Sequence, residues 1–234
     1  MSRFFRALLG AAVTPGGLVL PQTGRSVRVT NNTSWVALAN DVLGGRPGAW
    51  TFEAWIKKNT AAKQEAMASF FGGSLWLFND SRRLRGNASG ANTVISGEVV
   101  TLAEWQYAGI SNDTATGGVS RIYRNGVKIA EGARVAHGLG QVGANRLMAS
   151  PSSAAWWFDG WMCYARWWAR QRTDAEIAAD WDKLTISDTT GLVGCWPMNE
   201  GTGTTVVNYG SAGTAANGTL AGTAAYALDA PVLT

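Results

Sequence analysis

The dipeptide Asn125-Gly126 is the strongest local constraint on how this chain can fold, because it separates two short strand-like runs at residues 119–124 and 127–130. Both residues of an Asn-Gly pair readily adopt positive φ, as a two-residue turn between antiparallel strands requires. The common turns without positive φ would splay the two strands apart. The sequence therefore predicts a tight β-hairpin over residues 119–130.

Strand-like runs recur along the rest of the chain. Within residues 50–57, one face carries Trp50, Phe52, Ala54 and Ile56, and the other carries Thr51, Glu53, Trp55 and Lys57. This alternation is typical of a half-buried antiparallel strand. Further strands are predicted over residues 26–30, 74–78, 94–100, 106–111, 161–168 and 192–197. Trp35 and Trp76 are expected to be ordinary strand residues.

One segment has the pattern of an α-helix. Thr173 can cap the first amide groups, and Glu176 three residues later can complete a capping box. Ile177, Trp181 and Leu184 then recur at helical spacing. We expect a single helix of about ten residues.

The composition agrees with one all-β domain. The 234 residues include 29 glycines and 12 tryptophans, and only 15% of them are charged. A β-sandwich of this length is commonly one unit, and so low a charged fraction argues against disorder. Because no linker or repeat divides the chain, we expect an arm over residues 1–25 and one domain over residues 26–234.

The arm carries Arg3 and Arg6, followed by an apolar run at residues 7–13. This run resembles the core of a secretory signal, but it is at the lower limit of length and no small-x-small cleavage site follows it. It is also too short to span a bilayer. We expect the arm either to pack on a neighbouring subunit, with Phe4 and Phe5 as candidate contact residues, or to cap its own domain.

The charges and cysteines argue against two kinds of partner. The net charge is +4, and the longest basic cluster, at residues 82–85, is too short for a nucleic-acid-binding tail. Cys163, Cys195 and His137 are the only cysteines and the only histidine, which is too few for a structural zinc site. The two cysteines can form a disulfide in an oxidising compartment or remain buried thiols.

Five motifs follow one another between residues 26 and 222. They are WTFEAWIK at 50–57, WQYA at 105–108, IYRNGV at 122–127, FDGWMCYARWW at 158–168 followed by TDAEI at 173–177, and LVGCWPMNEGTG at 192–203, with Gly218-Thr219-Leu220 as the close. In this order they resemble the laminin-G-like and pentraxin-like branch of the concanavalin A-like lectin/glucanase superfamily. The resemblance implies an all-β jelly-roll sandwich of two antiparallel sheets with one short α-helix.

The resemblance does not imply one function, because members include lectins, adhesion modules, enzyme-appended binding domains and virion proteins. Relatives often carry Asp-Glu where this chain has Cys163-Tyr164, and often Asp before a Ser-Gly turn where it has Asn208-Tyr209. Calcium prefers several oxygen ligands, so each lost carboxylate weakens a bound ion. We expect no cofactor, with calcium as the open alternative.

Hydrolytic chemistry is not expected. Glycosidases of this superfamily use two carboxylates on one strand face, and no Glu-x-Asp-x-Glu pattern occurs in the chain. The clustered acids are Asp174, Glu176, Asp180 and Asp182, which lie on the predicted helix, where early acids favour its positive end. A catalytic triad would depend on His137 alone. We therefore predict a non-enzymatic protein.

Two features indicate contact residues. Adjacent Trp156 and Trp157 point to opposite sides of an extended chain, so one can enter the core. The other can stack on a sugar, fill a pocket of another subunit or cover the open end of the sandwich. The strand at 161–168 has large apolar groups on both faces, so it is covered on both sides or lies at a protein contact that includes Arg166 and Trp168.

These observations favour a structural or adhesion module that acts through protein–protein contacts, as a homo-oligomer or with other virion proteins. The expected setting is a bacteriophage virion, as a capsid decoration or tail-associated protein. The alternative is a secreted, extracellular carbohydrate-binding module of the lectin type, with a glycan as its partner. No nucleic-acid partner and no membrane span are expected.

Overall fold

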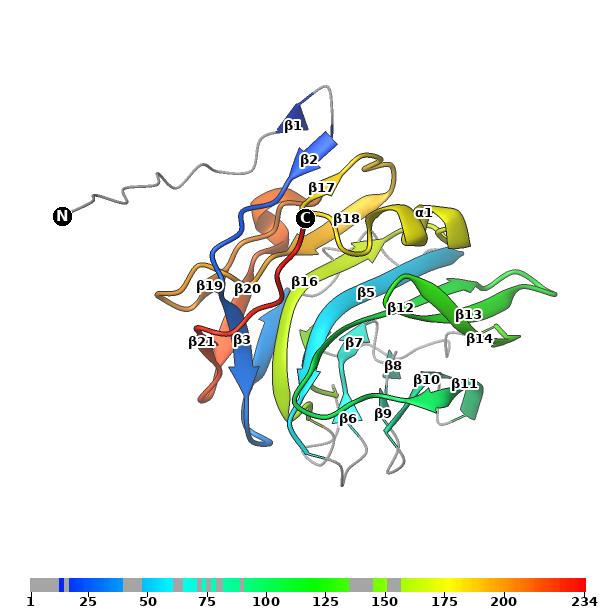
Figure 1. The fold of residues 1–234 in the computed structure, drawn as a ribbon, viewed down its shortest axis with the longest axis horizontal. Helices are drawn as coiled ribbons and strands as arrows, with labels where there is room; N and C mark the ends of the chain where they lie inside the picture. Colours follow the sequence, from blue (N-terminus) through cyan, green and yellow to red (C-terminus); the bar gives the residue numbers. More distant parts are fainter. Residues whose placement is uncertain are drawn as a thin grey trace.

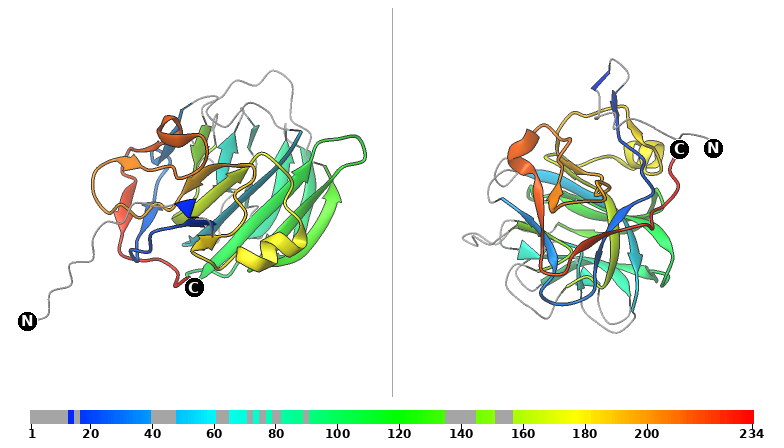
Figure 2. Two further views of the ribbon diagram at one scale, coloured as in Figure 1. Left: turned by 90° about the horizontal axis from the view of Figure 1, so that it is seen from above. Right: turned by 90° about the vertical axis from the view of Figure 1, so that its left-hand side faces the viewer.

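Alternating side chains give each main strand a face that is buried, and two antiparallel sheets bury these faces against each other in two layers (Figures 1 and 2). The computed structural model describes residues 13–14, 17–39, 48–60, 65–70, 73–74, 77–78, 82–88, 91–134, 145–150 and 157–234. Within this part of the chain, α1 (Asp174–Asp180) is the one α-helix. The predicted all-β jelly-roll sandwich with one short α-helix is confirmed.

The larger sheet has eight strands. Its order is β14-β13-β12-β5-β16-β3-β21, and β18 also pairs with β16. Its strands are β3 (Ser26–Val29), β5 (Ala49–Lys58), β12 (Trp105–Asp113), β13 (Val119–Arg124), β14 (Val127–Ala133), β16 (Gly160–Trp168), β18 (Leu192–Trp196) and β21 (Ala225–Ala227). The long strands β5, β12 and β16 form its centre (Figure 1).

The smaller sheet has six short strands in the order β19-β20-β4-β15-β7-β8. They are β4 (Trp35–Leu38), β7 (Ala68–Phe70), β8 (Gly73–Ser74), β15 (Asn145–Leu147), β19 (Thr205–Val206) and β20 (Gly218–Ala221). The remaining pairings join β10 (Arg83–Ala88) to β11 (Ala91–Val99) and β6 (Glu65–Ala66) to β9 (Leu77–Phe78). In a three-stranded sheet, β2 (Gly17–Val19) lies between β1 (Val13–Thr14) and β17 (Thr185–Ile186). A 3₁₀-helix, η1, spans Gly213–Ala216.

Most predicted elements are present, and two differ in extent. The run predicted as one strand at 74–78 belongs to β8 and β9, and residues 75–76 lie outside the described part. The capping box of α1 is confirmed, since Thr173 Oγ1 accepts from the Glu176 amide and Glu176 accepts from the Thr173 amide. The helix has seven residues rather than about ten. Its C-cap residue is Trp181, whose ring stacks on Trp55 of β5 with 5.5 Å between centroids.

The predicted hairpin is confirmed. Asn125 and Gly126 have φ values of 48° and 78°, and Arg124 pairs with Val127 across the turn. The Asn125 side chain also accepts a hydrogen bond from the Tyr107 amide at 2.9 Å, which ties the turn to β12. The turn supports the helical segment as well, because a Cβ on Gly126 would lie 2.4 Å from the Trp181 ring.

Replacing Gly126 by alanine tests this contact. The new Cβ has to displace the Trp181 ring, and alanine has to adopt the left-handed backbone conformation of Gly126. We therefore expect the free energy of unfolding to fall by on the order of 2–4 kcal/mol. Gly117→Ala is the matched control, because Gly117 has a similar φ of 81° and a Cβ added there would meet no atom within 4 Å. Urea unfolding followed by circular dichroism would compare the two. Equal losses would show that Trp181 does not depend on the glycine.

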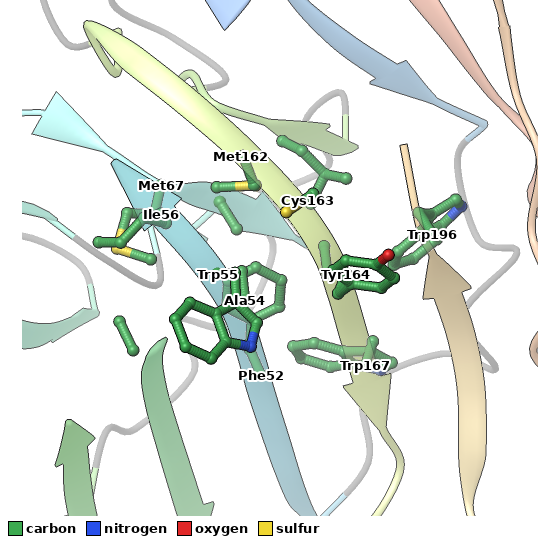
Figure 3. Close-up of a cluster of buried hydrophobic side chains, with 14 of the residues drawn as sticks. Phe52, Ala54, Trp55, Ile56, Met67, Met162, Cys163, Tyr164, Trp167 and Trp196 are labelled. Atoms are coloured by element: carbon green, nitrogen blue, oxygen red, sulfur yellow. The ribbon is translucent and has the colours of Figure 1, made fainter. Parts of the chain in front are cut away.

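Aromatic side chains from both sheets fill the core. Trp167 of β16 stacks on Trp50 of β5 with 5.4 Å between centroids, and Phe70 of β7 packs on the Trp167 ring at 4.6 Å. All three side chains are fully buried. Figure 3 shows neighbouring core side chains projecting from β5 and β16. The contact of Phe70 on β7 with Trp167 on β16 joins the two layers.

The prediction that the strand at 50–57 is half-buried is wrong. The structure buries both faces of β5, including Glu53 and Thr51, which are 0% exposed. The outer face is covered because α1 and the chain on either side of it pack on the large sheet, with Trp181 on Trp55 and Tyr107. The same segment covers β16 at Arg166 and Trp168, so the apolar groups on both of its faces, apart from the half-buried Trp161, are buried within this chain and do not indicate an oligomer interface.

The predicted boundary at residue 25 divides the core. Leu18 and Leu20 are 2% exposed and belong to the hydrophobic core. β2 pairs with β17, and the Leu20 amide donates to the Leu184 carbonyl at 2.9 Å. The second half of the predicted arm is thus part of the domain, as in the alternative of a local cap. The candidate contact residues Phe4 and Phe5 lie outside the described residues.

Candidate functional site

The predicted contact residues Arg166 and Trp168 belong to a buried ion cluster around Glu53. Arg166 Nη1 and Arg172 Nη1 lie 3.3 Å and 3.1 Å from Glu53 Oε1. The same oxygen accepts from Trp168 Nε1 at 3.1 Å, and Glu53 Oε2 accepts from the Tyr107 hydroxyl at 2.5 Å. Side chains from β12 and β16, and Arg172 just before α1, therefore converge on the Glu53 carboxylate of β5. We call α1 together with the residues on either side of it, from Arg172 to Lys183, the helical segment.

A second carboxylate closes this cluster. Asp180, at the end of α1, accepts from Arg172 Nη2 at 2.8 Å, and Arg166 donates to the backbone carbonyls of Asp180 and Lys183. Burial alone would raise the pKa of Glu53, but the charges of Arg172 and Arg166 outweigh it and hold that pKa below its usual value. Glu53 thus favours its ionised form, and its contacts with Arg166 and Arg172 fix α1 and the chain beside it on the sheet.

Burial excludes the predicted role of Arg166 and Trp168 as surface contacts. Arg166 is 1% exposed and Trp168 is 0% exposed, so neither can touch a ligand or a partner in this structure. The sequence prediction missed the burial of Arg166 and Trp168. The residues that cover these two side chains, Arg172 and Asp180, lie on the helical segment and belong to no sequence motif. Trp168 Nε1 donates to Glu53, and Arg166 donates to Glu53 and to two backbone carbonyls, all within this chain.

Trp157 is half-buried and packs against the core. It forms isolated bridges with Ala66 and Ala149, so it lies beside the chain that follows β15. Trp156, its predicted companion, lies outside the described residues. The structure therefore places only one member of this pair, and a role for the pair in ligand contact stays a prediction.

The cysteines form no disulfide. Cys163 and Cys195 are free thiols, and both are fully buried. Burial raises the pKa of Cys195 to about 12 and raises that of Cys163 well above its usual value. Because the thiolate is the nucleophilic form, both behave as small apolar core residues.

The outer face of the smaller sheet presents short, uncharged side chains beside one tryptophan and one arginine. Thr205, Thr219, Ala37 and Arg146 pair in sequence across β19, β20, β4 and β15. Trp35 lies two residues before Ala37 and therefore on the same face of β4. We call these five residues the Trp35–Arg146 face.

Alternation along the strands makes this face accessible. Val36 and Leu147 point to the core and are fully buried, whereas Trp35 and Arg146 between them are only partly buried. Thr205 and Thr219 are exposed. Neighbouring strands lie about 4.8 Å apart, so the row from β19 to β15 spans roughly 14 Å, enough for a short oligosaccharide.

Arg146 is held in place on this face. Its guanidinium carbon lies 4.2 Å from the centroid of the Trp35 ring, and its Nη1 donates to the Ser150 carbonyl at 3.1 Å. Burial lowers the pKa of this guanidinium. Ser150 follows Ala149, which forms a β-bridge with Trp157. Trp157, a predicted contact residue, therefore lies near the chain that holds Arg146. The arrangement offers a flat stacking surface and a fixed cation side by side.

Sequence reasoning missed this face. Trp35 was expected to be an ordinary strand residue, and no motif included Arg146. The alternation of Trp35 and Ala37 with Val36 and Leu38 could have indicated an outward indole. The contact with Arg146 could not have been predicted, because it depends on the pairing of β4 with β15.

Two further findings concern other kinds of site. Among the described residues, no group of three or more histidine, cysteine or acidic side chains converges as a metal site would require. No helix in the described part of the chain is long and apolar enough to cross a bilayer. The expectation that calcium is absent stays a prediction.

The chain can now be placed among known proteins. A family model described as the concanavalin A-like lectin/glucanases superfamily matches residues 30–178, well over half of the chain. The chain belongs to this superfamily. The resemblance predicted from the five motifs is therefore confirmed. No curated protein matches the sequence significantly.

Two solved structures resemble this superfamily member. One is a protein from Bacteroides ovatus for which carbohydrate binding has been proposed, with a TM-score of 0.71, 19% identity, and coverage of 89% of this chain and 61% of its own. The other is a heptameric SAP-like pentraxin from Limulus polyphemus, with a TM-score of 0.50, 11% identity, and coverage of 77% and 86%. At these identities the two structures establish the shared fold. The chain spans about three fifths of the Bacteroides protein.

Proposed function

We propose that this domain is a non-enzymatic carbohydrate-binding module that binds glycans on the Trp35–Arg146 face. The observation that carries the proposal is the half-buried Trp35 ring on an open sheet face whose other side chains, apart from Arg146, are small or hydroxyl-bearing. Aromatic rings stack on the apolar faces of sugars, and threonine hydroxyls can exchange hydrogen bonds with sugar hydroxyls. The lectin-type superfamily and the carbohydrate binding proposed for the Bacteroides protein support this function.

The residues of this face also support binding rather than hydrolysis. Glycosidases need two carboxylates flanking the scissile bond. The Trp35–Arg146 face, as defined by its five residues, contains no carboxylate. Glu53, which lies on the strand of the first family motif, is fully buried in its ion cluster and cannot reach a sugar.

Replacing Trp35 by alanine tests the proposed site. A glycan array would identify ligands of the wild-type domain, and isothermal titration calorimetry would give their affinities. We expect Trp35→Ala to weaken binding about tenfold or more, because the variant loses the stacking surface. Trp161→Ala is the matched control, since Trp161 is also half-buried beside an arginine but lies on the outer face of the larger sheet.

Two results would count against the proposal. An array on which the wild-type domain retains no glycan would remove the function. Equal weakening by Trp35→Ala and Trp161→Ala, or none by either, would remove the site. Circular dichroism of both variants would establish that each remains folded.

The prediction of a role on a bacteriophage virion concerns the setting of this module. A secreted, extracellular location is the alternative, and glycan recognition suits both. The observation that favours an assembly is β1, which is an outer strand of the three-stranded sheet β1-β2-β17 in the described part of the chain. An outer strand can accept a strand from another chain. Phe4 and Phe5, the predicted contacts, lie outside the described residues.

A further inference from the structure

We propose that the Trp35–Arg146 face selects glycans that carry a carboxylate or sulfate group, and that Arg146 binds this anionic group. The inference rests on the proposed function and deepens it by naming the class of glycan. The inference depends on which groups of the chain neutralise the charge of Arg146 and accept its hydrogen bonds.

Arg146 is a partly buried cation without an ion pair in the described part of the chain. Four other half-buried or buried arginines have a carboxylate partner: Arg121 pairs with Glu131, Arg170 with Glu176 and Asp188, and Arg166 and Arg172 with Glu53. No carboxylate of the described residues lies within 4.0 Å of the Arg146 guanidinium. A desolvated cation is stabilised by any anion that reaches it.

The hydrogen bonds of Arg146 lead to the same inference. The Ser150 carbonyl is the one acceptor that the described residues provide for this guanidinium, and Nε is buried without a partner there. A guanidinium has five N–H groups, so donors remain for a ligand. Stacking on Trp35 fixes the plane of the group in advance, which reduces the entropy lost when an oxyanion binds its donors.

The surroundings of Arg146 favour an anion on this face. Its direct neighbours in the cross-strand row, Ala37 and Ser69, are uncharged, so neither of them repels a carboxylate or sulfate. The net charge of +4 adds a weak long-range attraction. Trp35 would stack on the sugar ring while Arg146 binds its acidic substituent.

Arg28 offers a matched comparison on the opposite side of the sandwich. Its guanidinium carbon lies 4.7 Å from the centroid of the Trp161 ring, much as Arg146 lies over Trp35. Arg28 is exposed, however, so water solvates its charge. The pair Arg28 and Trp161 therefore has the same chemistry without the burial that makes Arg146 favour an anion.

Three pairs of probes test the inference: oligogalacturonate and its carboxyl-reduced form, sialyllactose and lactose, and sulfated and desulfated galactan. We expect the wild-type domain to bind at least one acidic member about tenfold or more tighter than its neutral counterpart, the effect of a charge-assisted hydrogen bond. Arg146→Gln should lose this preference and keep the neutral affinity, Arg146→Lys should retain part of it, and Arg28→Gln should behave as wild type. The first two pairs report carboxylates and the third reports sulfate.

The outcomes separate this inference from the proposed function. Equal binding of acidic and neutral members in all three pairs would overturn the selectivity and leave carbohydrate binding intact. An acidic preference that survives in Arg146→Gln would place the anion on another residue and overturn the assignment. Failure to bind any glycan, on the array as well as among these probes, would overturn both proposals. Urea unfolding of Arg146→Gln and Arg146→Lys would establish that the variants are folded.

Discussion

Glu53→Gln is expected to lower the free energy of unfolding by about 3–5 kcal/mol, the usual cost of removing one partner from a buried ion pair. Glu53 is 0% exposed and neutralises both Arg166 and Arg172, which are themselves 1% exposed. Glutamine keeps the shape and can still accept hydrogen bonds, but it leaves two buried guanidinium groups with only Asp180 as a counter-charge. The helical segment that these arginines fix should therefore detach from the sheet more easily.

Urea unfolding at neutral pH would measure this loss. Glu131→Gln is the matched control, because Glu131 also accepts from two basic side chains, Arg121 and Lys128, but lies on the surface. Exposed ion pairs are screened by solvent, so this control should show no measurable change. Comparable behaviour of the two variants would show that the buried cluster does not hold the sheet and the helical segment together.

The pH dependence gives an independent readout of the same cluster. The pKa of Glu53 is lower in the folded chain than its usual value of 4.5, so its carboxylate contributes stability above that value and loses it as the pH falls through the folded pKa. The difference between wild type and Glu53→Gln should therefore be constant near neutrality and narrow below about pH 4.5. A difference that does not change with acidification would mean that another group sets the stability.

The elements that the sequence predicted well depend on neighbours along the chain. The hairpin needs positive φ at Asn125 and Gly126, and the helix start needs Thr173 and Glu176 three residues apart. Both requirements involve residues only a few positions apart, so a short stretch of sequence is enough to predict them. The five motifs extended these local predictions to the whole sandwich, because their order is that of one family.

The parts that the sequence did not predict depend on residues far apart. Alternation correctly placed Glu53 opposite the core side of β5, but it could not show that Arg172 and Asp180 cover that side. For this reason the sequence predicted a half-buried strand where the structure has a fully buried one. The same limit applies to the candidate site, because Trp35 and Arg146 meet only through the pairing of β4 with β15.

Trp167→Ala is the second substitution with a large expected effect. Trp167 is 0% exposed and stacks on Trp50, with the planes 14° apart, while Phe70 of the other sheet packs on the same ring. Truncation removes the contact area and leaves a cavity that Trp50 and Phe70 cannot fill. We expect the free energy of unfolding to fall by about 3–5 kcal/mol. Urea unfolding followed by circular dichroism would measure it, since loss of a tryptophan alters fluorescence directly.

Trp161→Ala is the control for this core substitution as well as for the glycan-binding site. It lies on the same strand, but its ring is only half-buried between Arg28 and Lys57, so truncation should cost much less. Equal losses would mean that Trp167 does not join the two sheets. The expected contrast bears on function, because five tryptophans of the described residues, Trp50, Trp55, Trp167, Trp168 and Trp196, are explained by burial. Under the proposed function, sugar binding is expected of Trp35 on the outer face of the smaller sheet, and not of Trp161, which is half-buried on the outer face of the larger sheet.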